Sequence, residues 1–375
     1  MIPFNKPHAT GKELDYIKRA MAEGQLAGDG AMTKLCNARL RDMTKCHAAM
    51  ITHSCTAALE MAAILAGIEP GDEVIMPSYT FVSTANAFVL RGAVPVFVDI
   101  REDTLNMDEG KIEEAITPRA KAIAPVHYAG VGCEMDAIME IAARRGLVVI
   151  EDAAQGAMSS YKGKPLGTFG QMGALSFHET KNIVSGEGGA LLVNDPAFTE
   201  RAEIIREKGT NRSKFLSGQV DKYTWVDIGS SYLPGEIVAA FLLAQLEEAE
   251  RITHDRLAIW DTYHKAFEGG EKAGLFRRPV TPAHCAHNAH MYYLLLPDPA
   301  KRADFISHLK ESGVMSVFHY VPLHSSPAGK KLGRAHGSMK NTIGLSERIV
   351  RLPLWVGMAP TEINRVVELA YQAAR

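Results

Sequence analysis

The chain has 375 residues, of which 46% are hydrophobic and 22% charged, and its formal net charge is -2. This length predicts a large core and a smaller second lobe rather than one small domain. The low net charge argues against a nucleic-acid or anionic-membrane partner. The chain lacks an apolar run of the roughly 18 residues that a bilayer span needs, and its first residues lack the pattern of a secretory signal.

The cysteines and histidines do not form a recognisable disulfide or metal framework. The five cysteines are odd in number and scattered, which favours reduced thiols and a cytoplasmic location. His284, His287 and His290 have a crude metal-ligand spacing, but no second ligand pair stands at a recognised distance. We therefore expect solvated or hydrogen-bonding histidines there, and no metal site.

Short apolar segments alternate with helical patterns from about residue 48 to about residue 155. The segments are rich in Val and Ile, as strands are when helices cover both faces of a sheet. Such alternation predicts a mostly parallel α/β sheet with right-handed crossovers. The expected strands span residues 48–53, 73–76, 94–100, 120–126 and 147–150, and the expected helices span 56–65, 82–90, 109–116 and 135–145.

The pattern changes after residue 152. Strands are expected at 173–177 and 189–193, followed by a helix at 196–208, a long polar loop at 209–232 and a long helical pattern at 236–269. The C-terminal part predicts a smaller α+β lobe, with strands at 292–296 and 314–319 and helices at 303–312 and 361–373. We expect a large domain over residues 1–250, with an N-terminal arm over 1–30, and a small domain over 251–375.

Lys181 and Asp152 are the most informative residues. Each follows an apolar strand pattern, and ligands of open α/β sheets gather beyond the carboxyl ends of strands. A lysine amine suits the aldehyde of pyridoxal 5′-phosphate (PLP), and a carboxylate suits its protonated pyridine nitrogen. Alone, Lys181 is most simply a solvated loop lysine and Asp152 a helix cap. The pair, with the motifs below, predicts a PLP enzyme.

A strand-to-helix turn at residues 52–59 suits a phosphate group. Ser54, Cys55 and Thr56 stand at the expected helix start, where backbone N–H groups and the helix dipole attract anions. Ser176, at the end of a later strand, offers a hydroxyl to the same phosphate. The turn alone is more simply an ordinary N-cap.

Residues near two other strand ends suit the flat ring of the cofactor. Tyr79 and Phe81 offer an aromatic surface for stacking, although an aromatic residue at such a place is more often part of the core. Gln155, one helical turn beyond Asp152, offers an amide to the phenolic oxygen of the ring. The chain contains no dinucleotide-binding glycine fingerprint, no Walker A sequence and no nucleophile elbow that would favour another chemistry.

In this order along nearly the whole chain, these motifs resemble the nucleotide-sugar aminotransferases of the DegT/StrS type. The resemblance implies the PLP-dependent aspartate aminotransferase fold (fold type I), whose large domain holds a mostly parallel, mixed seven-stranded sheet. The matching stretches are Ser54–Leu59, Pro77–Thr84, Pro125–Gly130, Glu151–Gln155, Ser176–Asn182, Gly186–Gly189, His319–His324 and Glu347–Pro353.

The resemblance also implies roles for individual residues. Lys181 is the Schiff-base lysine, Asp152 the partner of the pyridine nitrogen, and Gln155 a contact of the ring oxygen. Phe81 stacks on the ring. The remaining cofactor contacts are Ser54, Cys55, Thr56, Ser176, Asn182 and Ser231, and the expected substrate contacts are Tyr79, Tyr320, His319 and Arg212.

The sequence departs from the family pattern at two of these positions. Cys55 replaces a usual glycine, and Ser231 stands where the neighbouring subunit commonly lends an asparagine. A serine still donates to a phosphate, although it has a shorter reach. Members of the family are usually homodimers whose two active sites lie at the interface, so we expect a homodimer.

Within the family, the likeness is to the transaminases that form dTDP-4-amino-4,6-dideoxy-D-galactose for surface polysaccharides. They transfer an amino group from L-glutamate to the C4 ketone of dTDP-4-keto-6-deoxy-D-glucose. The alternatives are a relative that acts on a C3 ketone or a UDP sugar, and a non-catalytic PLP or sugar-nucleotide regulator. The related sugar 3-dehydratases carry a histidine at the position of Lys181, so the lysine argues against that activity. The missing glycine fingerprint argues against a nicotinamide-dependent sugar reductase.

Overall fold

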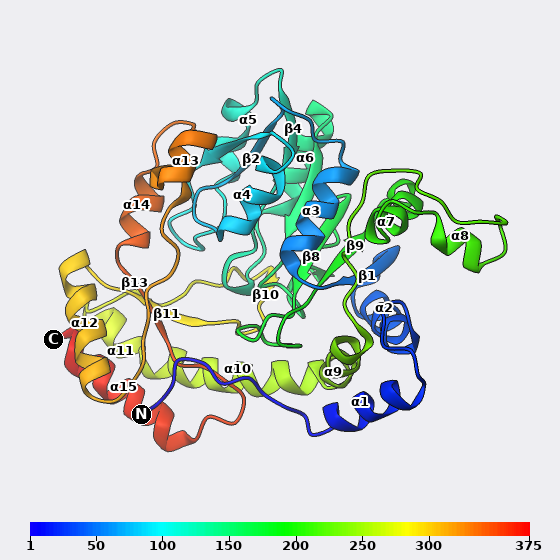
Figure 1. Ribbon diagram of the computed structural model, residues 1–375. Coiled ribbons are helices and arrows are strands. Elements are labelled where there is room, and N and C mark those ends of the chain that lie inside the picture. Colours follow the sequence, from blue (N-terminus) through cyan, green and yellow to red (C-terminus); the bar gives the residue numbers. More distant parts are fainter.

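An eight-stranded sheet forms the centre of the large domain (Figure 1). The computed structural model describes residues 1–375. The strand order is β1-β9-β8-β5-β4-β2-β3-β12, and only β9 runs antiparallel to its neighbours. The strands are β1 (Ala48–Thr52), β2 (Glu73–Pro77), β3 (Val94–Val98), β4 (Ala120–Ile123), β5 (Val148–Asp152), β8 (Met172–Ser176), β9 (Gly189–Val193) and β12 (Arg334–Ala335).

The seven strands that the sequence predicts in this sheet are all present, within a few residues of the expected bounds. The eighth strand, β12, is only two residues long and comes from the C-terminal part of the chain. It pairs in parallel with β3. Its Arg334 binds the fully buried carboxylate of Glu73 at 2.8 Å, which ties this part of the chain to β2. A contact between such distant segments has no local sequence signal.

Helices pack on both faces of the sheet, and the strand residues alternate between two apolar cores. In β9, for example, Ala190 and Leu192 face one core, whereas Leu191 and Val193 face the other. The helices of the first core are α2 (Ala31–Thr44), α5 (Ile112–Ala115), α6 (Met135–Arg145) and α9 (Glu236–Glu247). The helices of the second core are α3 (Cys55–Leu65), α4 (Val82–Val89) and α7 (Thr199–Arg206).

The parallel strands deliver the predicted motifs to one edge of the sheet. Strands β1, β2, β5 and β8 all end there, because β1 and β8 are both antiparallel to β9. Ser54 follows β1 and caps α3, accepting a 3.1 Å hydrogen bond from the Ala57 N–H. Phe81 follows β2 at the start of α4, and Asp152 and Ser176 are the last residues of β5 and β8.

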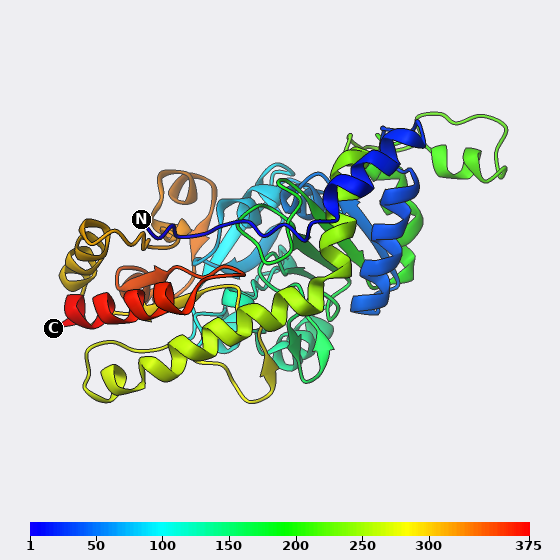
Figure 2. The same cartoon turned by 90° about the horizontal axis from the view of Figure 1, so that it is seen from below.

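The C-terminal lobe has a core of its own, which lies beside the large domain (Figure 1, Figure 2). Helix α10 (Ala249–Ala266) runs from the large domain into this lobe, and β11 (Tyr292–Leu295) pairs antiparallel with β13 (Ile349–Leu352). The predicted boundary at residue 250 stays a prediction. The other helices of this part are α11 (Glu268–Lys272), α12 (Pro299–Glu311), α13 (Pro327–Leu332), α14 (Lys340–Ser346) and α15 (Pro360–Ala374).

Two sequence predictions for this region need correction. The helical pattern at 236–269 forms α9 and α10 as separate helices, which meet at Glu248. The strand expected at 314–319 does not form. Val314 and Val317 make only single bridges, to Ile2 and to Arg351 of β13, and no continuous ladder joins them.

The N-terminal segment connects the lobe with the large domain. The Ile2 N–H donates to the Gly313 carbonyl at 2.8 Å, and the chain then runs along the molecule to α1 (Glu13–Ala22), which packs on α9 (Figure 2). Helices α1 and α2 lie within the expected arm and the residues after it, where no helix was predicted. Phe4 and Asn5 of this segment line the cavity described below.

The remaining elements are short. The predicted loop at 209–232 contains α8 (Arg212–Leu216), which projects from the body of the molecule (Figure 1). A small sheet joins β6 (Ser160–Tyr161), β7 (Lys164–Pro165) and β10 (Cys285–Ala286), and the 3-10 helices are η1 (Glu109–Lys111), η2 (Tyr128–Gly130), η3 (Pro196–Phe198) and η4 (Leu323–Ser325). Not one of the helices combines the length and the apolar character that crossing a bilayer requires.

Candidate active site

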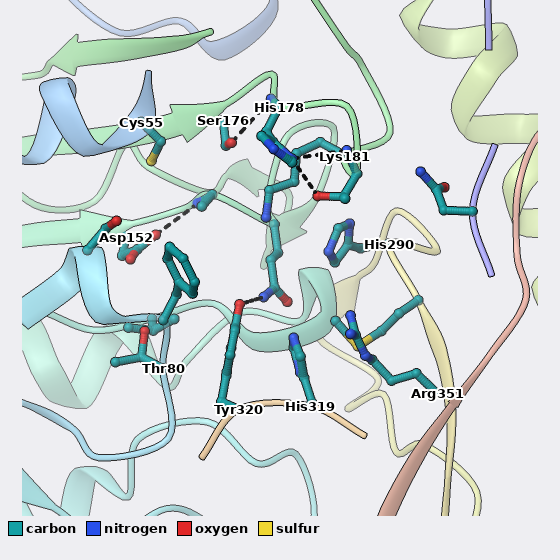
Figure 3. A pocket seen from close by; sticks show the side chains of 18 of the residues that line it. Cys55, Thr80, Asp152, Ser176, His178, Lys181, His290, His319, Tyr320 and Arg351 are labelled. Atoms are coloured by element: carbon teal, nitrogen blue, oxygen red, sulfur yellow. Dashed lines mark hydrogen bonds between the residues drawn. The ribbon is translucent and has the colours of Figure 1, made fainter. Parts of the chain in front are cut away.

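A cavity of about 730 Å³ lies at the carboxyl edge of the sheet, between the large domain and the C-terminal lobe (Figure 3). Its size is within the usual range of ligand-binding pockets. The large domain contributes Cys55, Thr80, Asp152, Ser176 and Lys181 to the wall. The lobe contributes His290, His319, Tyr320 and Arg351, and the N-terminal segment contributes Phe4 and Asn5.

Lys181 lies in the tight loop between β8 and β9. The loop is closed by the Ser185 N–H, which donates to the Phe177 carbonyl at 2.7 Å, and by the Lys181 N–H, which donates to the His178 carbonyl at 2.9 Å. The side chain extends into the cavity, between Asp152 on one side and His290 on the other (Figure 3). Burial lowers the pKa of Lys181, which increases the share of the neutral, nucleophilic amine.

Asp152 is held rigidly at the end of β5. Its N–H donates to the Pro125 carbonyl at 2.9 Å, and its carbonyl accepts from the His127 N–H at 3.1 Å. Its carboxylate Oδ2 accepts a 2.6 Å hydrogen bond from the Thr84 hydroxyl, and Oδ1 accepts from the Ala154 N–H at 3.1 Å. The carboxylate therefore has a fixed direction on the cavity wall, as the partner of a protonated ring nitrogen requires.

Glu151, the neighbour of Asp152, anchors the same strand end from the opposite side. Its fully buried carboxylate accepts from His127 Nε2 at 2.8 Å and from the N–H groups of Gly167, Phe169 and Gly170 at 2.6 to 2.9 Å. Four donors satisfy this buried charge, so the backbone of Asp152 has little freedom to move.

Gln155 and Tyr320 form a fixed pair on the next part of the wall. Gln155 Oε1 accepts from the Ala129 N–H at 2.6 Å, and its Nε2 donates to the Tyr320 hydroxyl at 2.9 Å. Phe81 is 55% exposed, and its ring centroid lies 6.1 Å from that of Tyr320. The exposed face of Phe81 is available to a flat ligand ring.

The start of α3 forms an anion-binding cradle. The N–H groups of Cys55 and Thr56 have no acceptor within the protein, as is usual in the first turn of a helix. Gly189 of β9 passes so close that a Cβ there would lie 2.3 Å from the Cys55 nitrogen. Ser176 lies near Cys55 on the same wall (Figure 3). A phosphate fits between these groups, and together with Lys181 and Asp152 they fit PLP.

The structure adds to the cavity wall one charged residue, Arg351, for which no role was predicted from the sequence. Arg351 of β13 reaches the cavity, where its Nε donates to the Phe318 carbonyl at 3.3 Å and its guanidinium lies 4.8 Å from the centre of the Phe4 ring. No carboxylate pairs with it, and burial lowers its pKa. The available signal was an arginine inside the apolar strand pattern Ile349–Leu352.

Three predicted contacts do not reach the cavity in this chain. Tyr79 is 1% exposed and packs behind the wall, with its ring 5.2 Å from Tyr128. Arg212 lies on α8, where its Nη1 donates to Glu207 at 2.8 Å. Asn182 is buried and donates to the Asn288 carbonyl at 2.7 Å, so it supports the wall without lining it.

Ser231 lies outside the cavity, and the three histidines that are close in sequence have different surroundings. Ser231 is exposed and does not line the cavity of its own chain, so its expected contact across a subunit interface stays a prediction. His284 contacts Glu134 at 3.0 Å, and His287 packs against Trp260 with the ring centroids 4.3 Å apart. His290 alone of the three lines the cavity, and no three His, Cys, Asp or Glu side chains are grouped as metal ligands.

Comparisons with known proteins agree with this geometry. The profile of the DegT/DnrJ/EryC1/StrS aminotransferase family matches residues 7–370. An uncharacterised protein of Methanocaldococcus jannaschii is 38% identical over 326 residues, which are 85% of this chain and 84% of that protein. The spore coat polysaccharide biosynthesis protein SpsC of Bacillus subtilis is 32% identical over 378 residues, covering 98% of this chain and 95% of SpsC.

Solved structures share the same fold. Spr1654, a proposed sugar aminotransferase of Streptococcus pneumoniae in its PMP form, superposes with a TM-score of 0.93 at 26% identity. The superposition covers 100% of this chain and 99% of that chain, and the same protein has also been solved in a PLP form. The mixed, mostly parallel sheet is therefore that of the fold type I aminotransferases. The chain is a PLP-dependent enzyme that belongs to the DegT/DnrJ/EryC1/StrS aminotransferase family.

Proposed function

We propose that this enzyme transfers an amino group from L-glutamate to the C4 ketone of dTDP-4-keto-6-deoxy-D-glucose, giving dTDP-4-amino-4,6-dideoxy-D-galactose. The motif resemblance described above supports this substrate. The likeness to a sugar aminotransferase and to a spore coat polysaccharide protein supports a sugar destined for a surface polysaccharide. The proposed enzyme is cytoplasmic and works as a homodimer in which Ser231 of each chain approaches the neighbouring site.

The observation that carries the proposal is the position of Lys181 and Asp152 on the wall of one cavity, brought there from two different strands. When bound, PLP supplies an electron sink for the negative charge that develops at the reacting carbon. Asp152, held by Thr84, keeps the pyridine nitrogen protonated and so maintains that sink. Gln155, held by Ala129 and Tyr320, and the exposed Phe81 would hold the ring of the bound cofactor.

Lys181 moves the proton. Its amine stands inside the cavity with a lowered pKa, which suits a group that takes a proton from one carbon and returns it to another. The same amine therefore determines which face of the substrate carbon receives the proton. Lys181 is only partly exposed, and its side chain lines the cavity.

Arg351 binds the carboxylate of the amino donor. It is a cation on the cavity wall without an acidic partner, and carboxylates pair with arginine in a directed, two-point manner. Once the donor has left as 2-oxoglutarate, the same space accepts the keto sugar. Two substrates that use one cavity in turn give ping-pong kinetics.

Two experiments test this function. Lys181→Ala should abolish turnover and the absorbance of the lysine-bound cofactor, whereas Lys164→Ala, a lysine packed over Phe169 outside the cavity, should leave both unchanged. Full activity of Lys181→Ala would refute the mechanism. A panel of C3- and C4-keto sugars linked to dTDP or UDP should give the highest kcat/KM with the dTDP C4 ketone, and a preference for another member would refute the substrate assignment.

A further inference from the structure

Two histidines on the lobe side of the cavity, His290 and His319, have different neutral tautomers, so the proton is on a different ring nitrogen in each. His290 Nδ1 lies 3.2 Å from Asn182 Oδ1. The amide of Asn182 is oriented by its Nδ2, which donates to the Asn288 carbonyl at 2.7 Å, so an oxygen faces the histidine. An oxygen only accepts, hence Nδ1 carries the proton. Burial lowers the pKa of His290 well below its usual value, so the ring is neutral and Nε2 keeps a lone pair.

His319 has the other tautomer. Its Nδ1 lies 2.7 Å from the hydroxyl of Tyr128, a side chain that is 1% exposed. The neighbouring Tyr79 hydroxyl does not meet the geometry of a hydrogen bond with any group, so His319 Nδ1 is the one acceptor in place for the Tyr128 hydroxyl, and a buried hydroxyl hydrogen without an acceptor is costly. Tyr128 therefore donates to Nδ1. Burial lowers the pKa of His319 well below its usual value, so the ring is neutral and its proton is on Nε2.

Both Nε2 atoms are free to meet a ligand. Neither has a hydrogen-bond partner within the protein, and both residues, which are 9% and 8% exposed, line the cavity. Figure 3 places the His319 ring between Tyr320 and Arg351 and the His290 ring between Lys181 and Arg351. This wall thus presents two donors, Arg351 and His319, beside one acceptor, His290.

We propose that His290 and His319 recognise the amino donor as an α-amino acid, with His319 Nε2–H and Arg351 binding its carboxylate and His290 Nε2 accepting from its amino group. An α-amino acid carries an acceptor and an N–H donor on neighbouring atoms, which matches this arrangement. The keto-acid product carries a carbonyl oxygen in place of the amine, and this oxygen would face the lone pair of His290 Nε2, which cannot donate a hydrogen bond to it. The wall thus favours the donor over its product. The inference rests on the proposed function.

The tautomers can be read directly. In the holoenzyme labelled with ¹⁵N-histidine, long-range ¹H–¹⁵N correlation spectra distinguish a protonated from an unprotonated ring nitrogen, and His290→Gln and His319→Gln variants assign the two rings. We expect a protonated Nδ1 in His290 and a protonated Nε2 in His319. The same tautomer in both rings, or the reverse assignment, would overturn the inference whatever the enzyme's activity.

Tyr128→Phe tests the consequence without changing the cavity wall. Without the Tyr128 hydroxyl, His319 is no longer held in one tautomer. Loss of its hydrogen bond to the charged donor should raise the L-glutamate concentration that half-saturates the first half-reaction by about tenfold. Saturation by the keto sugar in the second half-reaction should not change. Adding His319→Gln, whose amide donates in any case, should recover most of the loss. Tyr293→Phe, a neighbouring buried phenol with no bond to His319, is the matched control.

The outcomes separate the inference from the function on which it rests. Normal turnover with unchanged glutamate saturation in Tyr128→Phe would refute the role of the histidines alone. Absence of any half-reaction with L-glutamate in the unaltered enzyme would refute the proposed donor and, with it, the inference.

Discussion

The Thr84 hydroxyl donates a 2.6 Å hydrogen bond to Asp152 Oδ2, and both side chains are buried. The Thr84 oxygen lies in turn 2.7 Å from the Thr80 hydroxyl on the cavity wall. Because Thr84 donates to Asp152, its oxygen accepts from Thr80. A chain of two hydroxyls therefore sets the direction of the Asp152 carboxylate on the cavity wall.

Thr84→Val should weaken cofactor binding. The substitution keeps the shape of the side chain but removes the donor, and a hydrogen bond to a charged group contributes about 1.5–3 kcal/mol, which corresponds to about a tenfold or greater rise in the dissociation constant of PLP. Titration of the cofactor-free protein with PLP measures this constant. Thr84→Ser retains the hydroxyl and should bind PLP nearly as well as the unaltered enzyme, so equal weakening in both variants would contradict the role of the hydroxyl.

Arg351→Met should act on the donor rather than on the sugar. Removal of the unpaired guanidinium should raise KM for L-glutamate by about tenfold or more, because the carboxylate loses its charged partner, and KM for the keto sugar should change little. Steady-state kinetics with each substrate varied in turn give both constants. Arg348→Met is the control, since Arg348 binds the Gly344 carbonyl away from the cavity. An equal effect on both substrates would contradict the assignment.

The large-domain half of the site was predictable from the sequence because it is local. Lys181 and Phe81 follow strands, and Asp152 ends one, whose apolar patterns are visible in the sequence, and parallel strands bring their carboxyl ends to one edge. The sheet was predictable for the same reason. The exception is β12, whose two residues pair with β3 only once the C-terminal part of the chain has packed against the large domain.

The lobe half of the site was not predictable in the same way. Arg351, His290 and Phe4 reach the cavity only through the packing of the lobe and the N-terminal segment on the large domain. Tyr79 shows a second limit, because the residue after a strand turns either towards the cavity or towards the core. Here its ring joins a buried aromatic cluster with Tyr128 and leaves the wall to Tyr320.

Glu236→Ala should destabilise the fold. The Glu236 carboxylate is 1% exposed and accepts from the N–H groups of Gly30, Met32 and Thr33 and from the Thr33 hydroxyl, so it caps the start of α2 from a distance. Loss of this cap leaves several buried donors unpaired, which should lower the free energy of unfolding by about 3 kcal/mol or more. Urea unfolding measures the change.

The control for Glu236→Ala is Glu250→Ala, an exposed glutamate in the first turn of α10. It should change the free energy of unfolding by less than about 0.5 kcal/mol. Similar values for the two variants would contradict the capping role of Glu236.

Lys181→Met should stabilise the cofactor-free protein at neutral pH. Burial lowers the pKa of Lys181 below 10.5, so the unfolded chain binds its proton more tightly than the folded chain does. The resulting penalty on the folded state is present at neutral pH and disappears as pH rises towards 10.5. Urea unfolding of the unaltered and variant proteins at pH values near 7 and near 10 should show a difference that narrows with pH. A difference independent of pH would contradict the effect of burial.

The most direct test of the account is to locate the lysine that binds the cofactor. Borohydride treatment of the PLP-loaded enzyme makes the bond between lysine and cofactor permanent, and peptide mass spectrometry then identifies the modified residue. The account predicts modification of Lys181 and no other lysine, with loss of the adduct in Lys181→Ala. A permanent adduct on a different lysine, or an unmodified Lys181 in an enzyme that is still active, would contradict it.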